Sequence, residues 1–469
     1  MLRELTLMVL FSAALDATAA LADARQDCEK LRADAAIQAC GQAIGEFPRD
    51  ADAYDNRGAA YLAKGDLDRA IADYTKAIEI DPNYAKAWYS RGGAYVAMRD
   101  FDRAIADYTK AIEVDPKHAA LYNNRGLSYK AKGDLDRAIA DYTSAIAIDP
   151  KHASSYNNRG NAHAAAGDLD RAFADFTSAI AIDPKYAQGY YNRGNAYVAK
   201  GDLDRAIADY TSAIAIDPQY AVGYSNRGSA YQAKGDPDRA IADEATAIAL
   251  DPKNAVAYDS RGNAYLAKGD FDRAVADYTK AIEIDPNNAK ARYNRGFAYL
   301  SKVDLDNAIA DETKAIELNE KYVAAYTSRG NAYAAKGDLD RAIADYAKAI
   351  ELDPKNAGPH AARCWLRAAH DRDLPLALAD CDAAARLAPN NANILYSRGF
   401  VYLRLDRLDE ATADYDAALK INPRQADALY GRGLAKRRKG DPAGGDADIA
   451  GAMAIQANIA VEYARYGVN

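Results

Sequence analysis

The sequence predicts an all-α solenoid built from tandem helix hairpins of 34 residues. Three observations predict this fold: the tripeptide Asn/Ser-Arg-Gly and the dipeptide Asp-Pro each recur every 34 residues, and the apolar residues between them follow helical spacing. One hairpin cannot bury its own apolar face, so stacking between repeats must stabilise this chain of 469 residues. The tripeptide places its arginine at Arg57, Arg91, Arg125, Arg159, Arg193, Arg227, Arg261, Arg295 and Arg329, and the register continues, with one inserted residue, through Arg363, Arg398 and Arg432.

The first 22 residues have the order of a secretory signal peptide. Arg3 precedes an apolar run from Leu5 to Leu15, and small residues follow as far as Ala22. This run is too short to cross the ~30 Å hydrocarbon core of a membrane, so we expect cleavage after Ala19 or Ala22. The alternative is an apolar first helix that caps the fold, because Glu4 weakens the basic start.

The rest of the chain divides into a short hairpin, twelve repeats and a final helix. Residues 23–50 are expected to form the hairpin as a partial repeat, and residues 51–459 the twelve repeats. In the first full repeat, Gly65 offers a left-handed end for the first helix, Asp66 a cap for the second, and Pro82 a stop. A helix within residues 460–469 is predicted to cover the exposed face of the last hairpin, as the end of a solenoid requires.

The repeat unit resembles the tetratricopeptide repeat. The signature of that family places aromatic, Gly, Tyr, Ala, aromatic, Ala and Pro where this chain has Tyr54, Gly58, Tyr61, Ala70, Tyr74, Ala77 and Pro82. The resemblance covers about residues 51–459 and implies a right-handed α-solenoid whose first helices line a concave groove. It implies a protein that binds other proteins, here of an exported bacterial type.

The chain departs from the family pattern at several positions. Arg57 and its equivalents stand where the family usually has leucine, and we expect the guanidinium to pair with a helix-borne aspartate such as Asp73. Glu244 and Glu312 replace the buried second-helix tyrosine in two repeats, and Val303 replaces the glycine that ends a first helix. The sixth and eighth repeats should therefore be looser than their neighbours.

Composition and motifs exclude several classes of function. A net charge of −8 leaves no basic face in bulk, which argues against nucleic acid, and a mean hydropathy of −0.41 argues against an integral membrane span. The sequence contains no H-E-x-x-H, G-x-x-x-x-G-K-[ST], G-x-S-x-G or helix-opening G-x-G-x-x-G motif. We therefore expect neither an enzyme nor a cofactor.

The four cysteines fall in facing positions of two hairpins. Cys364 and Cys381 stand at positions that face each other between the paired helices of a repeat, and Cys28 and Cys40 do so if the first hairpin is shorter. We predict disulfides Cys28–Cys40 and Cys364–Cys381, each of which would stabilise its hairpin by roughly 3 kcal/mol. The alternatives are four buried thiols in a reducing cell, or a metal site that includes His360.

Asparagine is frequent just before the repeated arginine, and again three residues after that first position, on the same helix face. An asparagine can both donate and accept, so a series of them can hold the backbone of an extended peptide. Some peptide-binding members of the family carry an asparagine ladder at the first of these positions. The alternative is a polar, solvated face. The predicted partner-binding asparagines are Asn56, Asn124, Asn158, Asn192, Asn226 and Asn294, and, on the second position, Asn161, Asn195, Asn263 and Asn331.

A tyrosine recurs on the same helix in every third repeat, at Tyr89, Tyr191 and Tyr293. Tyrosines are common anchors at interfaces, so these three are predicted to contact side chains of a partner. The alternative is that they record the duplication of a block of three repeats.

Together these features predict a protein-interaction scaffold that binds a peptide or a helical segment of another protein in its concave groove. The alternative is a structural or self-assembling array of near-identical repeats. With the signal peptide, we expect the periplasm or cell envelope of a bacterium; without it, the protein is expected to be cytoplasmic.

Overall fold

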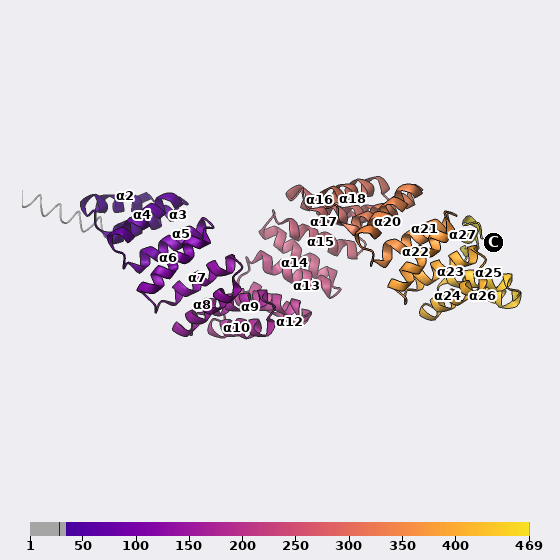
Figure 1. The fold of residues 1–469 in the computed structure, drawn as a ribbon, viewed down its shortest axis with the longest axis horizontal. Coiled ribbons are helices and arrows are strands. Elements are labelled where there is room, and N and C mark those ends of the chain that lie inside the picture. The colour runs from indigo at the N-terminus through magenta and orange to yellow at the C-terminus, as the bar shows by residue number, and fades with distance from the viewer. Residues whose placement is uncertain (1–27, 29–33, 469) are drawn as a thin grey trace, which may run out of the picture. The chain divides into compact units, whose positions relative to one another are not determined.

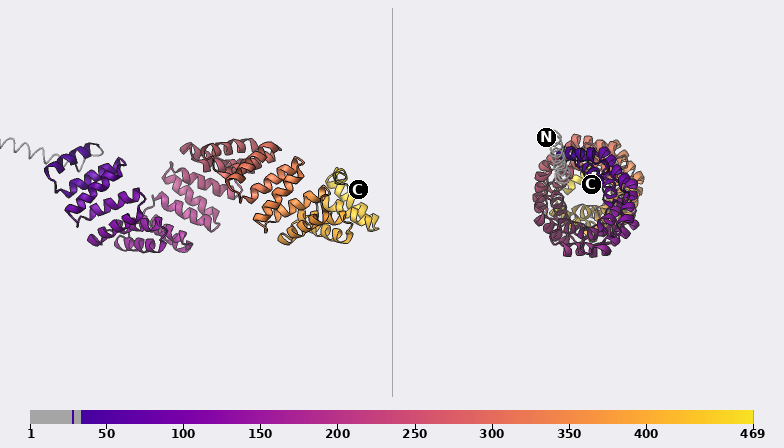
Figure 2. Two further views of the ribbon diagram at one scale, coloured as in Figure 1. Left: turned by 45° about the horizontal axis from the view of Figure 1, so that its top comes forward. Right: turned by 90° about the vertical axis from the view of Figure 1, so that its left-hand side faces the viewer.

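The computed structural model describes Cys28 and residues 34–468, and in this part of the chain every regular element is a helix (Figure 1). The chain forms two compact units, which we call the N-terminal unit (residues 1–234) and the C-terminal unit (residues 235–469). Within each unit, successive hairpins pack side by side (Figure 2). These elements confirm the predicted all-α solenoid of stacked helix hairpins.

From residue 34 onward, the N-terminal unit consists of helix α2 followed by hairpins. We call the two helices of each hairpin the first and the second helix. The helices are α2 (Asp34–Glu46), then the pairs α3 (Ala51–Ala63) and α4 (Leu67–Ile80), α5 (Ala85–Ala97) and α6 (Phe101–Val114), α7 (Ala119–Ala131) and α8 (Leu135–Ile148), α9 (Ala153–Ala165) and α10 (Leu169–Ile182), α11 (Ala187–Ala199) and α12 (Leu203–Ile216), and the first helix α13 (Ala221–Ala233).

The C-terminal unit has the same order and ends with one additional short helix. Its helices are the second helix α14 (Pro237–Leu250), then the pairs α15 (Ala255–Ala267) and α16 (Phe271–Ile284), α17 (Ala289–Ser301) and α18 (Leu305–Leu318), α19 (Val323–Ala335) and α20 (Leu339–Leu352), α21 (Ala357–Ala369) and α22 (Leu374–Leu387), α23 (Ala392–Arg404) and α24 (Leu408–Ile421), α25 (Ala426–Arg438) and α26 (Pro442–Ile455), and α27 (Ile459–Arg465).

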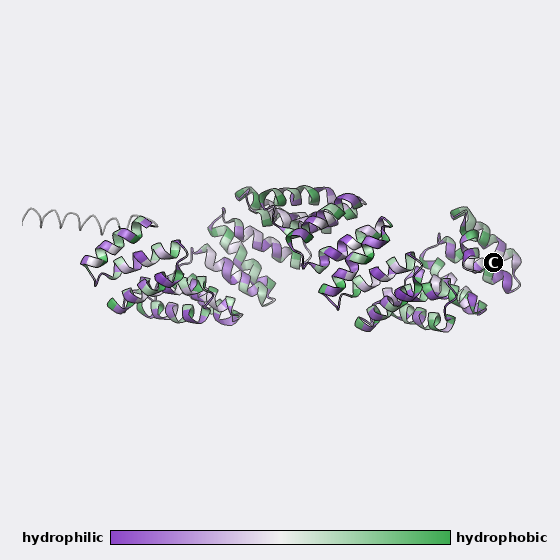
Figure 3. Ribbon diagram, turned by 90° about the horizontal axis from the view of Figure 1, so that it is seen from above, coloured by the Kyte–Doolittle hydropathy of each residue, from purple (hydrophilic) through white to green (hydrophobic). Residues whose placement is uncertain are grey.

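The hairpin between α3 and α4 shows why each repeat folds in this way. Gly65 takes a left-handed conformation with φ of 78°, which ends α3, and the side chain of Asp66 accepts from the backbone N–H of Arg69 at the start of α4. Gly58 makes room for the buried ring of Tyr74, because a Cβ atom at residue 58 would lie 2.7 Å from its Cε1 atom. Hydrophilic and hydrophobic residues alternate around the helices (Figure 3), so each helix has an apolar side for these contacts.

The repeated arginine joins the two helices of its own hairpin. Arg57 Nε and Nη2 donate to the two carboxylate oxygens of Asp73, each at 2.7 Å, which confirms the predicted pairing. Arg91 adds a bond from Nη1 to the Thr75 hydroxyl of the preceding repeat at 3.0 Å. The same bidentate pair is formed by Arg91–Asp107, Arg125–Asp141, Arg159–Asp175, Arg193–Asp209, Arg261–Asp277, Arg295–Asp311, Arg329–Asp345, Arg363–Asp380, Arg398–Asp414 and Arg432–Asp448.

The residues that depart from the repeat pattern still adopt the fold of the repeat, two of them with a strained backbone. Val303 and Arg99 hold left-handed conformations, with φ of 61° and 60°, at positions where other repeats have glycine. Glu244 and Glu312 are buried in the place of the second-helix tyrosine.

Both predicted disulfides are present. Cys28 is bonded to Cys40 of α2, and Cys364 of α21 is bonded to Cys381 of α22, with Cα atoms 4.6 and 5.3 Å apart. Residues 1–22, the predicted signal peptide, lie outside the described residues. None of the described helices combines the length and apolar character that crossing a membrane requires.

Candidate functional site

The surface considered for binding is formed, within each unit, by the first helices. We number positions from the first residue of each first helix and call the surface of positions 2, 5, 6, 9 and 12 the inner face. In α3 these positions are Asp52, Asp55, Asn56, Ala59 and Leu62. All the predicted partner-binding residues occupy position 5, 6 or 9.

Position 6 carries the first set of predicted asparagines, and most of them bond to the preceding repeat. Asn192 Nδ2 donates to Asn157 Oδ1 at 2.8 Å, and Asn294 Nδ2 donates to Asp259 Oδ1 at 2.9 Å. The same step from position 6 to position 5 is made by Asn124 to the Tyr89 hydroxyl, Asn158 to Asn123 and Asn226 to the Tyr191 hydroxyl, at 2.9, 3.0 and 3.1 Å.

These five side chains, Asn124, Asn158, Asn192, Asn226 and Asn294, form what we call the amide ladder. Each rung links two successive first helices, and a bond of this kind stabilises a protein by about 1 kcal/mol. The amide ladder therefore fixes one repeat against the next, a use that the sequence analysis did not foresee. Asn56 differs, because its Oδ1 accepts from Lys86 Nζ at 3.4 Å.

Position 9 carries the second set of predicted asparagines, and these bond to buried tyrosines. Asn195 Oδ1 accepts from the Tyr210 hydroxyl at 2.7 Å. Asn263 and Asn331 accept in the same way from the second-helix tyrosines of their own repeats, at 2.9 and 2.8 Å. In α8, where position 9 of the paired helix is a leucine, the Tyr142 hydroxyl is buried with no hydrogen-bond partner.

Asn161 is the exception at position 9, because the second helix of its repeat carries Phe176, which has no hydroxyl. The hydrogen bond to the buried tyrosine could therefore have been predicted from the sequence, because each asparagine that forms it is followed fifteen residues later by a tyrosine. Asparagine at position 9 satisfies a buried hydroxyl, and leaving such a group without a partner costs about 1–3 kcal/mol.

The three predicted tyrosine anchors are half-buried between repeats. Tyr191 packs on Tyr210 and Tyr220, with ring centroids 5.9 and 5.2 Å apart. Tyr89 packs on Tyr108 at 5.9 Å, and Tyr293 packs on Tyr322, the N-cap residue of α19, at 5.1 Å. Their rings therefore contribute to stacking between repeats and present only part of their surface to a partner.

Residues from all three predicted sets meet at one place in the N-terminal unit. A pocket of about 240 Å³ opens between α11, α12 and α13, and we call it the α11–α13 pocket. Asn226 Nδ2 there donates both to the Tyr191 hydroxyl and to Asn195 Oδ1, at 3.1 and 2.9 Å. The wall contains both apolar and polar side chains; it consists of Asn195, Val198, Leu203, Tyr210, Asn226, Ser229, Ala230 and Ala233.

Large apolar side chains are also exposed on the inner face of both units. They stand at positions 2, 9 and 12 of the first helices. In the N-terminal unit they are Val96, Leu127, Val198 and Val222, and in the C-terminal unit Val256 and Phe297. Sequence reasoning missed most of them, because exposure on one helix face depends on how the neighbouring repeats pack.

The short helix α27 packs on the inner face of the C-terminal unit. Besides its contacts with α25 and α26, its Tyr463 ring lies 5.6 Å from Phe400 of α23, and its neighbour Tyr466 lies 5.4 Å from Trp365 of α21. The Tyr463 hydroxyl donates to the Asp427 carbonyl oxygen at 2.7 Å. The helix predicted to cover the end of the last hairpin thus also covers the inner side of the last three first helices.

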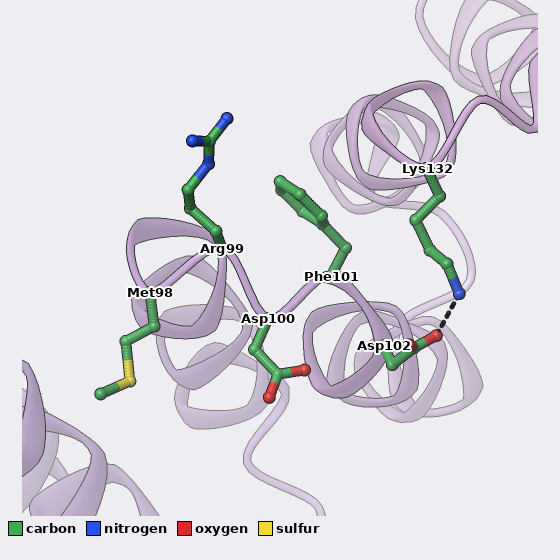
Figure 4. Close-up of a pocket in the computed structure, with 6 residues that line it drawn as sticks. All are labelled: Met98, Arg99, Asp100, Phe101, Asp102 and Lys132. Atoms are coloured by element: carbon green, nitrogen blue, oxygen red, sulfur yellow. Dashed lines mark hydrogen bonds and ion pairs between the residues drawn. The ribbon is translucent and has the colours of Figure 1, made fainter.

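A further pocket, of about 320 Å³, lies at the turn between α5 and α6 (Figure 4). Lys132 pairs with Asp102 at its edge, while Met98 and Arg99 are directed away from this ion pair. The turn between α15 and α16 has a matching pocket with the pair Lys302–Asp272. Because it recurs with the repeat, this pocket is a general surface feature rather than a specialised site.

Family models match most of the chain. Models described as TPR repeat match residues 58–99, 194–235 and 262–303, and models described as tetratricopeptide repeat match residues 89–153, 124–187, 176–208, 221–254, 289–322, 323–356 and 392–425. A search of curated proteins found no match.

Solved structures that resemble the chain include several repeat proteins. A tetratricopeptide repeat protein from Parabacteroides merdae is 21% identical over 53% of this chain and 98% of its own, with a TM-score of 0.43. Yeast Tom70 is 18% identical over 90% of this chain and 95% of its own, with a TM-score of 0.40. YrrB, described as a TPR protein with an unusual peptide-binding site, is 27% identical over 40% of this chain and 96% of its own, with a TM-score of 0.34.

Proposed function

Because the chain belongs to the tetratricopeptide repeat family, we propose that it is a scaffold without catalytic activity that holds a peptide or helical segment of another protein on its inner face. The observation that carries this proposal is the row of exposed apolar side chains at positions 2, 9 and 12 of the first helices. A group of exposed apolar side chains on one face of a folded protein is typical of an interaction surface. Polar groups beside it, as in the α11–α13 pocket, supply the hydrogen bonds that orient a partner.

The α11–α13 pocket, where residues of the three predicted sets meet, offers a place for a partner side chain in the N-terminal unit. Val198 and Leu203 supply apolar lining, and Ser229 adds a hydroxyl. The asparagines of the amide ladder already donate hydrogen bonds between repeats, so a partner could use mainly the amide atoms that these bonds do not occupy. Among the predicted asparagines, Asn331 is exposed and Asn161 faces a phenylalanine, so these two are better placed to bind peptide backbone.

The same proposal includes export to the periplasm or cell envelope of a bacterium. Two disulfides support it, because such bonds persist in oxidising compartments and are rare in the cytosol. Fractionation of producing cells, with a non-reducing peptide map, tests this part. Recovery from the cytosol alone, with four free thiols, would contradict it.

Site-specific photocrosslinking tests the binding surface. A crosslinking amino acid at Val198 or Phe297, on the inner face, should capture a partner in cells, while the same group at Ala215, exposed on the second helix α12, should capture much less. Equal capture from Val198 and Ala215 would refute the inner face as the binding surface. Adducts that contain only this chain would instead favour a self-assembling array.

A further inference from the structure

Two first helices of the C-terminal unit carry the same apolar triad. Positions 5, 9 and 12 are Tyr293, Phe297 and Leu300 in α17, and Tyr396, Phe400 and Leu403 in α23. The tyrosine and phenylalanine rings adopt the same arrangement in both helices, with centroids 6.5 Å apart and interplanar angles of 37° and 42°. The two helices therefore present closely similar surfaces.

In α23 this surface is covered by α27. Phe400 is 0% exposed, and its ring lies 5.6 Å from Tyr463 and 5.9 Å from Tyr466. Tyr463 and Ile459, which stand four positions apart and so share one side of α27, belong to the same apolar cluster as the α23 triad. The structure thus shows one segment that covers this triad: a short helix with an aliphatic residue followed four positions later by a tyrosine.

In α17 the corresponding surface is open. Phe297 is 41% exposed, while Tyr293 and Leu300 are half-buried. Tyr293 packs on Tyr322 on its other side, as Tyr191 packs on Tyr220 in the N-terminal unit, so its orientation is fixed before any partner arrives. A preformed apolar surface of this kind costs little conformational entropy on binding.

The surroundings of the two triads differ in polarity. The neighbours of α23 are aromatic, with Trp365 5.3 Å from Phe400 and Tyr430 4.7 Å from Tyr463. Beside α17, position 9 is asparagine in both adjacent first helices, at Asn263 and Asn331. An occupant of α17 must therefore combine one apolar ridge with polar residues on either side.

Charge and hydrogen bonding set further limits on the occupant. Lys290, at position 2 of α17, is paired with Asp259 at 3.2 Å, which leaves little net charge beside the triad. The Tyr463 hydroxyl of α27 donates to the backbone carbonyl oxygen at position 2 of α25. Every residue has a carbonyl oxygen, so α19, the first helix that follows α17, offers the same acceptor at its position 2, which is Ala324. A tyrosine on the occupant would find an equivalent acceptor there.

We propose that α17 binds an amphipathic helix of a partner protein, with Phe297 as the anchor, through an aliphatic residue and a tyrosine four positions later. This inference rests on the proposed scaffold function and deepens it, because it selects a helical rather than an extended segment and names the side chains that are recognised. The partner helix carries polar residues on both flanks of this apolar ridge.

The test uses a fluorescently labelled peptide of residues 455–468, which contains α27, and fluorescence anisotropy with the full-length protein. The peptide should bind saturably, and Phe297→Asn should weaken binding at least 10-fold. Asparagine already occupies position 9 in α15 and α19, so this variant is expected to fold, and circular dichroism checks that it does. Leu387→Asn is the matched control, because Leu387 is 40% exposed but lies on the second helix α22, off the inner face, and it should leave binding unchanged.

A peptide in which the residue equivalent to Tyr463 is alanine should bind at least 10-fold more weakly. Absence of binding overturns the inference. Equal binding to the wild type and to Phe297→Asn also overturns it, and this is the result expected if the peptide merely displaces α27 from α23. Dimers in sedimentation velocity that Phe297→Asn abolishes would overturn the choice of a partner protein in favour of α27 from a second copy. If peptide binding fails while Val198 still captures a partner by photocrosslinking, only this inference fails and the scaffold function stands.

Discussion

Replacing Glu312 should both stabilise the eighth repeat and remove a pH dependence. Glu312 is 0% exposed, and it occupies the place where the second helices of most other repeats carry an aromatic ring. A Cβ atom at Gly296 would lie 3.0 Å from its Oε1 atom, so the carboxyl group fills the space beneath that glycine. Burial raises the pKa of Glu312 to about 9, an effect that Asp311 strengthens, while the Ser328 hydroxyl and Arg329 oppose it.

The magnitude follows from the difference in pKa between the folded and unfolded chains. Below about pH 4.5, the ordinary value, Glu312 is protonated in both states and its full contribution to stability is present. Between that pH and about 9, the unfolded chain releases the proton whereas the folded chain keeps it, so stability falls as pH rises. At about 1.4 kcal/mol per pH unit, the loss reaches about 3 kcal/mol at pH 7.

Glu312→Gln should remove this loss while nearly preserving size. Glu312→Phe should add the packing that Phe176 provides beneath Gly160 in the fourth full repeat, the hairpin of α9 and α10. Urea unfolding of the full-length chain, followed by circular dichroism at several pH values, reports the overall effect. Hydrogen exchange of the α18 amides at each pH, corrected for the intrinsic rate, localises it. Glu317→Gln, a change on the surface of the same helix, is the control and should alter stability by less than about 0.5 kcal/mol.

The decisive result is the change with pH. The difference between Glu312→Gln and the wild type should be small near pH 4.5 and grow to about 3 kcal/mol at pH 7. A difference that is the same at both pH values would refute the argument, because a purely steric effect does not titrate.

Two further predictions concern glycine positions. Val303→Gly should raise the free energy of unfolding by about 1 kcal/mol, because it relieves a left-handed conformation with φ of 61°; thermal unfolding measures the gain, and Ala310→Gly within α18 should instead lose about 1 kcal/mol. A lower melting temperature for Val303→Gly would contradict the assigned strain. Gly262→Ala should lower the free energy of unfolding by about 1–3 kcal/mol, since the added Cβ atom would lie 2.6 Å from Tyr278 Cε1. The control is Gly93→Ala, which should not destabilise the protein, because the nearest atom to its added Cβ atom is 3.9 Å away. Equal urea midpoints for both variants would count against this reasoning.

Much of the hairpin could be predicted from the sequence because its determinants are local. Gly65, Asp66 and Pro82 act on their own backbone, and Arg57 and Asp73 are sixteen residues apart in two helices whose pairing the repeat already implies. The disulfide between Cys364 and Cys381 follows from the same geometry, since facing positions in one hairpin are fixed by helical period and turn length.

The roles of the asparagines could not be predicted in this way. Asn192 bonds to Asn157 in the neighbouring repeat, and Asn195 accepts from a tyrosine buried beneath it, so each role depends on how two or three helices meet. A polar residue on a predicted groove is equally consistent with a ligand, solvent or a neighbouring helix. Only the packed structure distinguishes these partners, and for position 6 it selects the neighbouring helix.

The sequence by itself determined the repeat, its two helices and the contacts within each hairpin, because these depend on periodicity, turn residues and short separations along the chain. The tertiary structure alone decided which inner-face side chains are engaged between repeats and which remain exposed. It also decided that α27 covers the triad of α23 while Phe297, in the same triad of α17, stays open. The physical reason is that burial depends on all the segments that approach a side chain, and those segments can lie far away in the sequence.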